Sequence, residues 1–273
     1  MSNETELSPI EIIRAKLDPT IVTRGRVVLI GLGGIGLWLA NAIVTFLAGL
    51  RQALPPGEDV DILLCDGDDF GIENTYRMDV PDFGNKAFVL GQHMLDRIDC
   101  PGVNIRWYQA FIEEENAHDL IAEGNCVLLA CDNHATRRLV SLRCQSLDNV
   151  VLISGGNDGV EDGSRGTYGN VQVYIRHGGR DATAALDKFH DAIANPPDEL
   201  PSHESCTQLA AVGVPQLSIV NLAVASAMCN ALLRLMMPVP GERMYDEVAL
   251  DVLDAVNTPH WITGPQEIDD QGK

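Results

Sequence analysis

The stretch RVVLIGLGGIG, residues 26–36, decides how the rest of this chain is interpreted. Residues 27–31 form an apolar run rich in β-branched residues and predict a buried strand, and an apolar helical stretch follows from about residue 34 to 50. The loop between them has the spacing GxGxxG, in which glycine permits a tight turn and close approach of the backbone to a ligand. A helix that starts there presents unpaired N–H groups to phosphate. The motif predicts a nucleotide site without naming the nucleotide, and its glycines are Gly31, Gly33, Gly34 and Gly36.

Strands and helices alternate through the rest of the first half of the chain. Further strands are predicted over 60–66, 103–110, 125–130 and 150–155, and helices over 85–98 and 134–146. This alternation predicts a parallel, doubly wound sheet. The strands are almost continuously apolar, which is typical of a sheet covered on both faces. The predicted fold class is α/β, with a Rossmann-like and mainly parallel sheet.

The second half of the chain predicts one strand, a long connection and a long helix. The strand NVQVYI at 170–175 precedes a mobile crossover over about 177–207, which is rich in helix-breaking residues. An apolar helix over 215–237 and antiparallel edge strands in EVALDVLDAV follow. We expect an N-terminal helical arm over 1–25, a single domain over 26–265 and an acidic tail over 266–273.

Composition argues against several classes of partner. The formal net charge of −20 repels duplex DNA and anionic membranes over most of the surface, so we expect neither as a partner. No apolar run approaches the roughly 20 residues of a membrane span, and the N-terminus lacks the features of a secretory signal. Seven cysteines without a CxxC pair predict reduced core thiols, a cytoplasmic location and no zinc.

Two acids, an amide and two cations follow the second predicted strand. Asp66 lies where a Rossmann-type sheet places the acid that binds ribose hydroxyls, and the alternative is an exposed acid that ends a strand. Asp68 follows at once. Asn74, Arg77 and Lys86 come next and are suited to hold phosphate oxygens during attack at an α-phosphorus. The alternative for Arg77 and Lys86 is a role as solvated surface charges.

The fourth predicted strand ends in LLACDNHATRR, residues 128–138. Asp132 is expected at the carboxyl edge of the sheet, where it could hold Mg²⁺. The alternative is that Asp132 and Asn133 form a turn and a helix cap. Each alternative is plausible singly, but the whole series in this order favours a site that grips a triphosphate.

These motifs resemble the ThiF, MoeB and ubiquitin-activating enzyme superfamily. The resemblance covers about residues 26–155 and resumes at ESCTQLAAVGVPQLSIVNL, which begins at residue 204. It implies a ThiF-type domain that adenylates the C-terminal glycine of a small ubiquitin-like protein with Mg-ATP. Bacterial stand-alone members, one variety of which accompanies plasmid-borne gene clusters, are the nearest in size. The implied nucleotide-binding residues are Gly31, Gly33, Gly34, Gly36, Asp66, Asp68, Asn74, Arg77, Lys86, Asp132 and Asn133, with Asp132 on magnesium.

The implied catalytic residues are Arg77, Lys86, Asp132 and Cys206. A thiolate before a helix is nucleophilic, so Cys206 is open to two interpretations, an acyl acceptor and a packed cysteine. The family's zinc ligands are missing, so we expect the crossover to be held by packing alone. Arg14 is a candidate for the arginine that reaches into a partner subunit, and the family and the helix over 215–237 both suggest a homodimer.

Two other functions remain as alternatives. An NAD(P)-dependent oxidoreductase is favoured if Arg77, Lys86 and Asp132 prove to be surface charges. A non-catalytic dimer partner that binds a ubiquitin-like protein is the second, and the complete set of site residues argues against it.

Overall fold

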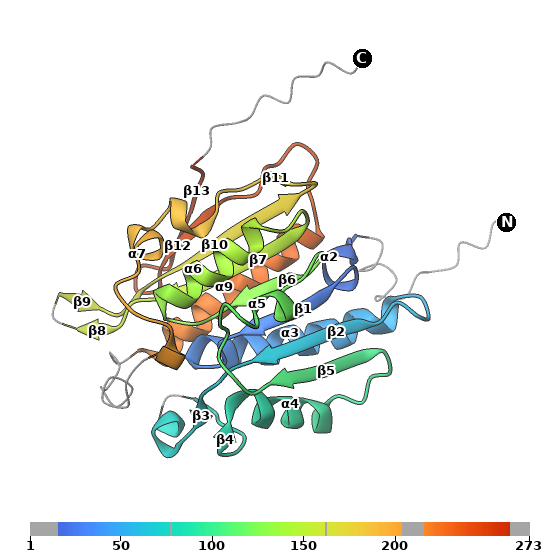
Figure 1. Ribbon diagram of the computed structural model, residues 1–273, viewed down its shortest axis with the longest axis horizontal. Coiled ribbons are helices and arrows are strands. Elements are labelled where there is room, and N and C mark those ends of the chain that lie inside the picture. Colours follow the sequence, from blue (N-terminus) through green and yellow to red (C-terminus); the bar gives the residue numbers. More distant parts are fainter. Residues whose placement is uncertain (1–15, 77, 162, 204–215, 263–273) are drawn as a thin grey trace, which may run out of the picture.

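β1 (Arg26–Ile30), the strand of the glycine motif, lies inside a mixed sheet in the computed structural model, which describes residues 16–76, 78–161, 163–203 and 216–262 (Figure 1). Within these residues the sheet has nine strands. Across the sheet they are β13 (Val256–His260), β12 (Glu247–Asp251), β10 (Tyr168–His177), β7 (Val150–Asn157), β6 (Cys126–Leu129), β1, β2 (Val60–Cys65) and β5 (Val103–Tyr108), with β11 (Arg180–Asp181) paired to β10.

Five neighbouring strands, β7, β6, β1, β2 and β5, are parallel, and β10, β12 and β13 continue the sheet antiparallel. Ile30 of β1 pairs with Cys65 of β2 on one side and with Leu129 of β6 on the other. The chain order therefore reverses at β1, and ligands of open α/β sheets bind beyond the carboxyl ends of the strands at such a point. The predicted Rossmann-like sheet with antiparallel C-terminal edge strands is confirmed.

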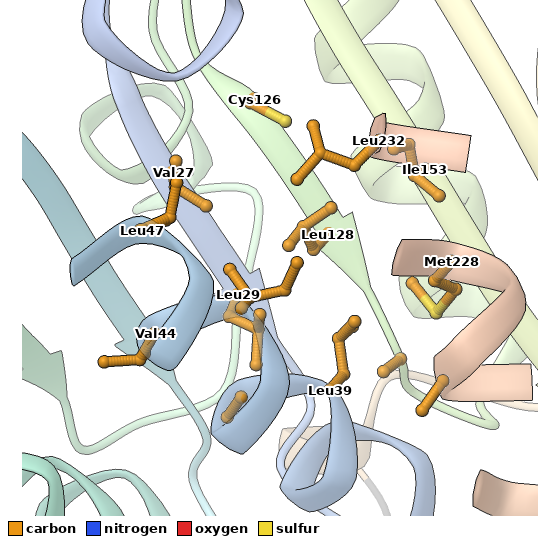
Figure 2. Packing of buried hydrophobic residues seen from close by; sticks show 14 of the residues in the cluster. Val27, Leu29, Leu39, Val44, Leu47, Cys126, Leu128, Ile153, Met228 and Leu232 are labelled. Carbon is orange, nitrogen blue, oxygen red and sulfur yellow. The ribbon is translucent and has the colours of Figure 1, made fainter. Parts of the chain in front are cut away.

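One face of the sheet is covered by three helices, α3 (Gly34–Ala53), α4 (Lys86–Arg97) and α9 (Ser218–Met236). Figure 2 shows Leu29 of β1 and Leu128 of β6 packed with Leu39 and Leu47 of α3 and with Met228 of α9. All of these side chains are fully buried. This is the larger of the apolar cores, and it fixes α3, whose first residues carry the glycine motif.

The other face is covered by α5 (Ala117–Leu120), α6 (His134–Gln145) and α7 (Asp191–Ala194). Alternate residues of β1 reach the two cores: Val27 and Leu29 pack on the α3 side, and Val28 and Ile30 on the α6 side. Because both faces are covered, β1 is apolar at every position after Arg26, as expected for a covered sheet.

Among the described residues, α3 and α9 are long and apolar enough to cross a membrane by length and composition. The expectation that no apolar segment reaches this length is wrong. In the most apolar window, 56% of α3 and 44% of α9 is buried inside the protein. Both helices pack against the sheet, and this burial accounts for the apolar residues on their inner faces.

Several short elements were not predicted from the sequence. β3 (Asp69–Phe70) and β4 (Gly84–Asn85) pair around a short 3₁₀ helix, η1 (Ile72–Tyr76), and β8 (Val160–Glu161) pairs with β9 (Ser164–Arg165). Strands of two residues leave no hydrophobic period in the sequence, so periodicity could not reveal them. β3, η1 and β4 form a lobe that carries Asn74 and leads into Lys86 at the start of α4.

The crossover between β10 and α9 contains β11, η2 (Leu186–Lys188), α7 and η3 (Pro201–His203) in its described part. The expectation that packing alone holds it is wrong. Besides the buried Leu186 and Ile193, hydrogen bonds join it to the domain: Gln145 Nε2 donates to Asp187 Oδ1 (3.2 Å), and Ala184 N donates to Asp246 Oδ1 (2.6 Å).

Both ends of the chain lie partly beyond the described residues. Residues 16–25 of the N-terminal arm are described and include α2 (Thr20–Thr23), whereas Arg14 and the acidic tail fall outside the described residues. The division into arm, domain and tail stays a prediction.

Candidate functional site: a nucleotide cavity at the carboxyl edge of the sheet

Backbone conformation and close contacts explain three of the four glycines in the loop after β1. Gly31 has a φ of +85°, a left-handed conformation that favours glycine. A Cβ on Gly36 would lie 1.9 Å from the Gly31 carbonyl oxygen, and one on Gly34 would lie 2.1 Å from Nδ2 of Asn221. At Gly33, nothing lies within 4 Å of the Cβ position, and Gly33 lines a cavity. The backbone requires glycine at positions 31 and 36, the buried Asn221 side chain crowds Gly34, and Gly33 leaves open space for a ligand.

The N-terminus of α3 is open to a ligand, whereas that of α6 is occupied. Gly33 is the N-cap of α3 and supplies no side-chain hydrogen bond, so the first N–H groups of that helix have no cap. At α6, Asn133 Oδ1 accepts from the backbone N–H of Thr136 (2.7 Å), and the Asp198 carboxylate accepts from the first two N–H groups of the helix (both 2.8 Å). Of these two helix starts, α3 is the one suited to bind phosphate.

Asp66 lies at the end of β2 with 9% of its surface exposed. Its Oδ2 accepts from Leu32 N (2.6 Å) and its Oδ1 from Asp68 N (2.9 Å). Burial raises the pKa of this carboxyl, against the opposing effects of Lys86 and the two backbone N–H donors. The alternative of an exposed acid is wrong. Asp66 ties the glycine loop to β2 and lines the cavity, where its remaining lone pairs can accept from ribose hydroxyls.

Lys86 is the first residue of α4 and is 7% exposed. Its ammonium group forms an ion pair with Asp68, whose exposed carboxylate lines the cavity. Asn85 fixes this arrangement: its Oδ1 accepts from Phe88 N (3.1 Å), and its Nδ2 donates to the carbonyl oxygens of Asp66 (3.1 Å) and Asp68 (3.2 Å). The alternative of a solvated charge is wrong for Lys86, which is a buried cation paired at the rim of the cavity.

Asn74 and Arg77 have different outcomes. Asn74 is buried in η1, where its Oδ1 accepts from Gly71 N (2.8 Å) and shapes the turn after β3. Neither Asn74 nor Lys86 is among the cavity-lining residues in the described part of the chain. Arg77 lies outside the described residues. The phosphate contacts of Asn74 and Arg77 therefore stay predictions.

Asp132 follows β6, is exposed and lines the same cavity as Gly33. Its side chain has no hydrogen bond or ion pair with another described residue. The alternative of a helix cap is confirmed for its neighbour Asn133, the N-cap of α6, which also lines the cavity. A single carboxylate of this kind fits Mg²⁺, which in nucleotide sites takes one or two carboxylates together with substrate phosphates and keeps several waters.

A dedicated metal cage is absent from the described ranges, in which no group of three His, Cys, Asp or Glu side chains could hold a metal ion. Binding of magnesium through Asp132 and a bound triphosphate requires no such cage. The residues present therefore fit Mg²⁺ that arrives with its nucleotide.

Arg137 belongs to the site although the sequence analysis gave it no role. Its Nε and Nη2 donate to the carbonyl oxygen of Cys131 (3.0 and 2.9 Å), and its Nη2 also donates to that of Gly155 (3.0 Å). Arg137 thus joins the ends of β6 and β7. An arginine in the first turn of a helix resembles a surface charge in sequence, so only the fold reveals this contact.

Cys65 and Cys131 line the cavity, and Cys126 lies in the core on the α3 side of the sheet. Burial raises the pKa of Cys65, Cys126 and Cys131 to about 12 each, so their thiols stay protonated at neutral pH. This agrees with the prediction of core cysteines. Cys206 lies outside the described residues.

A family comparison identifies the kind of protein that carries this cavity. The model of the ThiF family matches residues 15–254, which is most of the chain. This chain belongs to the ThiF family. ThiF-family membership supports an adenylating enzyme of the ThiF and MoeB kind that binds and uses ATP. A comparison with curated proteins finds no match.

Solved structures share the ThiF fold at low sequence identity. PaaA is 14% identical with a TM-score of 0.61, and the match covers 96% of this chain and 78% of PaaA. MccB of E. coli, solved with ATP, is 15% identical with a TM-score of 0.60, and the match covers 88% of this chain and 65% of MccB. MccB with AMPCPP and MccA is 16% identical with a TM-score of 0.62, and the match covers 90% of this chain and 66% of MccB. This chain therefore spans about two thirds of MccB, and at this identity the likeness shows the fold alone.

Proposed function

We propose that this protein adenylates the C-terminal glycine of a small ubiquitin-like protein, using Mg-ATP and releasing pyrophosphate. Membership of the ThiF family and the geometry of the cavity support the adenylation. The ubiquitin-like substrate rests on the resemblance of the site motifs to ubiquitin-activating enzymes. The solved complexes of MccB with ATP and with MccA support a site that takes a nucleotide and a second molecule.

One observation carries the choice of nucleotide. The cavity joins an uncapped helix N-terminus at Gly33 to the unpartnered carboxylate of Asp132. A carboxylate beside a phosphate site repels the phosphates unless a divalent cation lies between them. Mg-ATP brings that cation, whereas NAD is bound by Rossmann enzymes without one. The site therefore favours Mg-ATP over the oxidoreductase alternative.

In the adenylation step, a carboxylate oxygen of the substrate attacks the α-phosphorus of ATP. The new O–P bond forms as the bond from the α-phosphorus to the pyrophosphate oxygen breaks. The N–H groups of α3 and the Lys86 ammonium supply positive charge for the phosphate oxygens. Magnesium at Asp132, when bound, neutralises further negative charge. The products are an acyl-adenylate, in which AMP is a good leaving group, and pyrophosphate.

The order of residues along the sheet edge indicates where the substrate enters. Asp66 follows β2 and suits the ribose, whereas Gly156 and Asn157 at the end of β7 line the other end of the cavity. Asn157 Oδ1 is buried and has no hydrogen-bond partner in the described part of the chain. It is available to a peptide N–H of the substrate. We place the C-terminal residues of the substrate on this β7 side.

The remaining parts of the proposal rest on the sequence. Transfer of the acyl group to Cys206 stays a prediction, and so does a cytoplasmic location. A homodimer is supported by α9, whose outer face exposes Ile219, Leu222 and Leu233. The alternative of a non-catalytic partner is disfavoured because Asp66, Lys86 and Asp132 are all in place.

The test is ATP–pyrophosphate exchange in the presence of a ubiquitin-like protein that ends in glycine. We expect exchange with the intact partner and none with a partner that lacks its C-terminal glycine. Lys86→Ala should lower the exchange rate by about a hundredfold, because it removes a charge that stabilises the phosphates. The matched control is Lys188→Ala, which removes an exposed lysine paired with Asp187 on the crossover (3.0 Å). Equal exchange rates in Lys86→Ala and Lys188→Ala would show that Lys86 has only a structural role.

A further inference from the structure

The crossover is bonded to the start of α6, beside the nucleotide cavity. Asp198 lies on the crossover, and its two carboxylate oxygens accept from His134 N and Ala135 N (both 2.8 Å). The next carbonyl, that of Glu199, accepts from Asn133 Nδ2 (2.7 Å). These partners are 63 to 66 residues away in the chain, and all three are the first residues of α6 or its cap. The crossover is therefore bonded to the residues that directly follow Asp132.

The loop from β6 into α6 is fixed on both sides of Asp132. Arg137 holds the carbonyl oxygen of Cys131, the residue before it, and Asn133, the residue after it, is bonded to Thr136 and to the crossover. Asp132 itself has no partner among the described residues. The backbone is thus immobilised while the carboxylate is left free and exposed at the cavity.

We propose that Asp198 is a positioning residue for Asp132, so that the crossover aligns the carboxylate that binds magnesium with the nucleotide. The inference rests on the proposed function, because it needs a metal–nucleotide complex at Asp132. Groups that orient a metal ligand through a hydrogen-bonded backbone change the affinity of the metal without touching it. Asp198 acts in this way through the first turn of α6.

Asp198 has a second effect at the same place. A negative charge at a helix N-terminus is stabilised by the helix dipole, and it closes that terminus to other anions. With Asp198 in place, α3 is the open helix start at the cavity. The triphosphate is then directed to the side of the cavity that carries Gly33, and Asp132 faces it from the β6 side.

The test measures metal affinity apart from activity. Mn²⁺ is titrated into the protein saturated with AMPCPP, and free Mn²⁺ is followed by electron paramagnetic resonance. Asp198→Asn keeps the size of the side chain but loses its charge and one acceptor. We expect Mn²⁺ to bind about tenfold more weakly in this variant, while binding of AMPCPP without metal changes by less than about twofold.

The matched control is Asp191→Asn, which removes the same charge from the same crossover. Asp191 is exposed, and its Oδ1 accepts from Asn195 Nδ2 (2.8 Å) within α7. We expect this variant to bind Mn²⁺ as the wild type does. Equal Mn²⁺ affinity in Asp198→Asn and the wild type would overturn the inference, and so would equal weakening in both variants.

A third variant separates position from folding. The serine hydroxyl can still accept a hydrogen bond, and Asn133 remains the N-cap of α6, so Asp198→Ser is expected to keep α6 folded while it still weakens Mn²⁺ binding. If Asp198→Asn fails to fold, Asp198→Ser with wild-type Mn²⁺ affinity would also overturn the inference. Failure of the proposed function looks different: the wild type itself then binds no AMPCPP with Mn²⁺. If the wild type binds AMPCPP and Mn²⁺, and the Asp198 variants bind Mn²⁺ as tightly as the wild type does, the proposed function stands and the role of Asp198 is wrong.

Discussion

At the scale of single residues, the glycine loop shows how one motif serves two purposes. A side chain on Gly36 would meet the backbone of Gly31, whereas one on Gly33 would meet open space in the cavity. The four glycines look alike in the sequence. Their surroundings separate those that the fold needs from the one that a ligand needs.

This difference predicts opposite outcomes for two alanine variants. Gly33→Ala should leave the free energy of unfolding within about 1 kcal/mol of the wild type and should weaken ATP binding at least about tenfold, because its methyl group enters the ligand's space. Gly36→Ala should lower the free energy of unfolding by about 3 kcal/mol, because its Cβ overlaps a carbonyl oxygen. Urea unfolding and calorimetric titration of both proteins provide the comparison. Equal nucleotide affinity in Gly33→Ala and the wild type would contradict this account of the loop.

Several site residues could be predicted from the sequence, and others could not. Asp66 and Lys86 stand beside motifs whose spacing has a physical meaning, so their positions followed from the order of strand, loop and helix. Asn85 and Asp198 act on backbone groups that become neighbours only in the folded chain. Asp198 is 64 residues from its first partner, and an acid between prolines carries no signal of such a contact.

At the scale of elements, an ion pair and an amide join the crossover to the antiparallel edge of the sheet. Glu247 of β12 accepts at Oε1 from His190 Nε2 (2.6 Å), at the start of α7, and from Asn170 Nδ2 of β10 (2.7 Å). Burial alone would raise the pKa of Glu247. The hydrogen bonds from His190 and Asn170, with the charge of His260 in addition, leave the pKa below its ordinary value of 4.5.

A lowered pKa in the folded state has a definite consequence for stability. The contribution of Glu247 is fully present above its unfolded pKa and is lost as the pH falls through the lower folded pKa. Between about pH 5.5 and about pH 3.5, the wild type should therefore lose more free energy of unfolding than Glu247→Gln does. Urea unfolding at the two pH values measures both losses. Parallel losses in the two proteins would show that Glu247 adds nothing to this pH dependence.

The elements themselves were predictable where they are long. Helices α3, α4, α6 and α9 and the parallel strands follow from their hydrophobic patterns, and α3, α4 and α6 also have glycine or asparagine at their starts. The lobe of β3, η1 and β4 could not be predicted in this way, because its elements are two to five residues long. Local hydrogen bonds hold it, such as the one that Asn74 Oδ1 accepts from Gly71 N. Local hydrogen bonds decide such structure, and periodicity does not record them.

At the scale of the whole molecule, the sheet brings separate segments to one edge. The parallel strands β1, β2 and β6 lie side by side in the sheet (Figure 1). The glycine loop after β1, Asp66 after β2 and Asp132 after β6 lie far apart in the sequence, and all three line the same cavity. The formal net charge of −20 opposes binding of an anionic nucleotide at long range. The local N–H groups, Lys86 and a divalent cation must overcome this repulsion.

The measurement that tests this account most directly is a calorimetric titration of the full chain with Mg-ATP, with ATP in the presence of a chelator, and with NAD. We expect Mg-ATP to bind at least about tenfold more tightly than either of the others, because the Asp132 carboxylate at the phosphate site requires a cation with the nucleotide. Binding of NAD together with no binding of Mg-ATP would contradict the adenylation site.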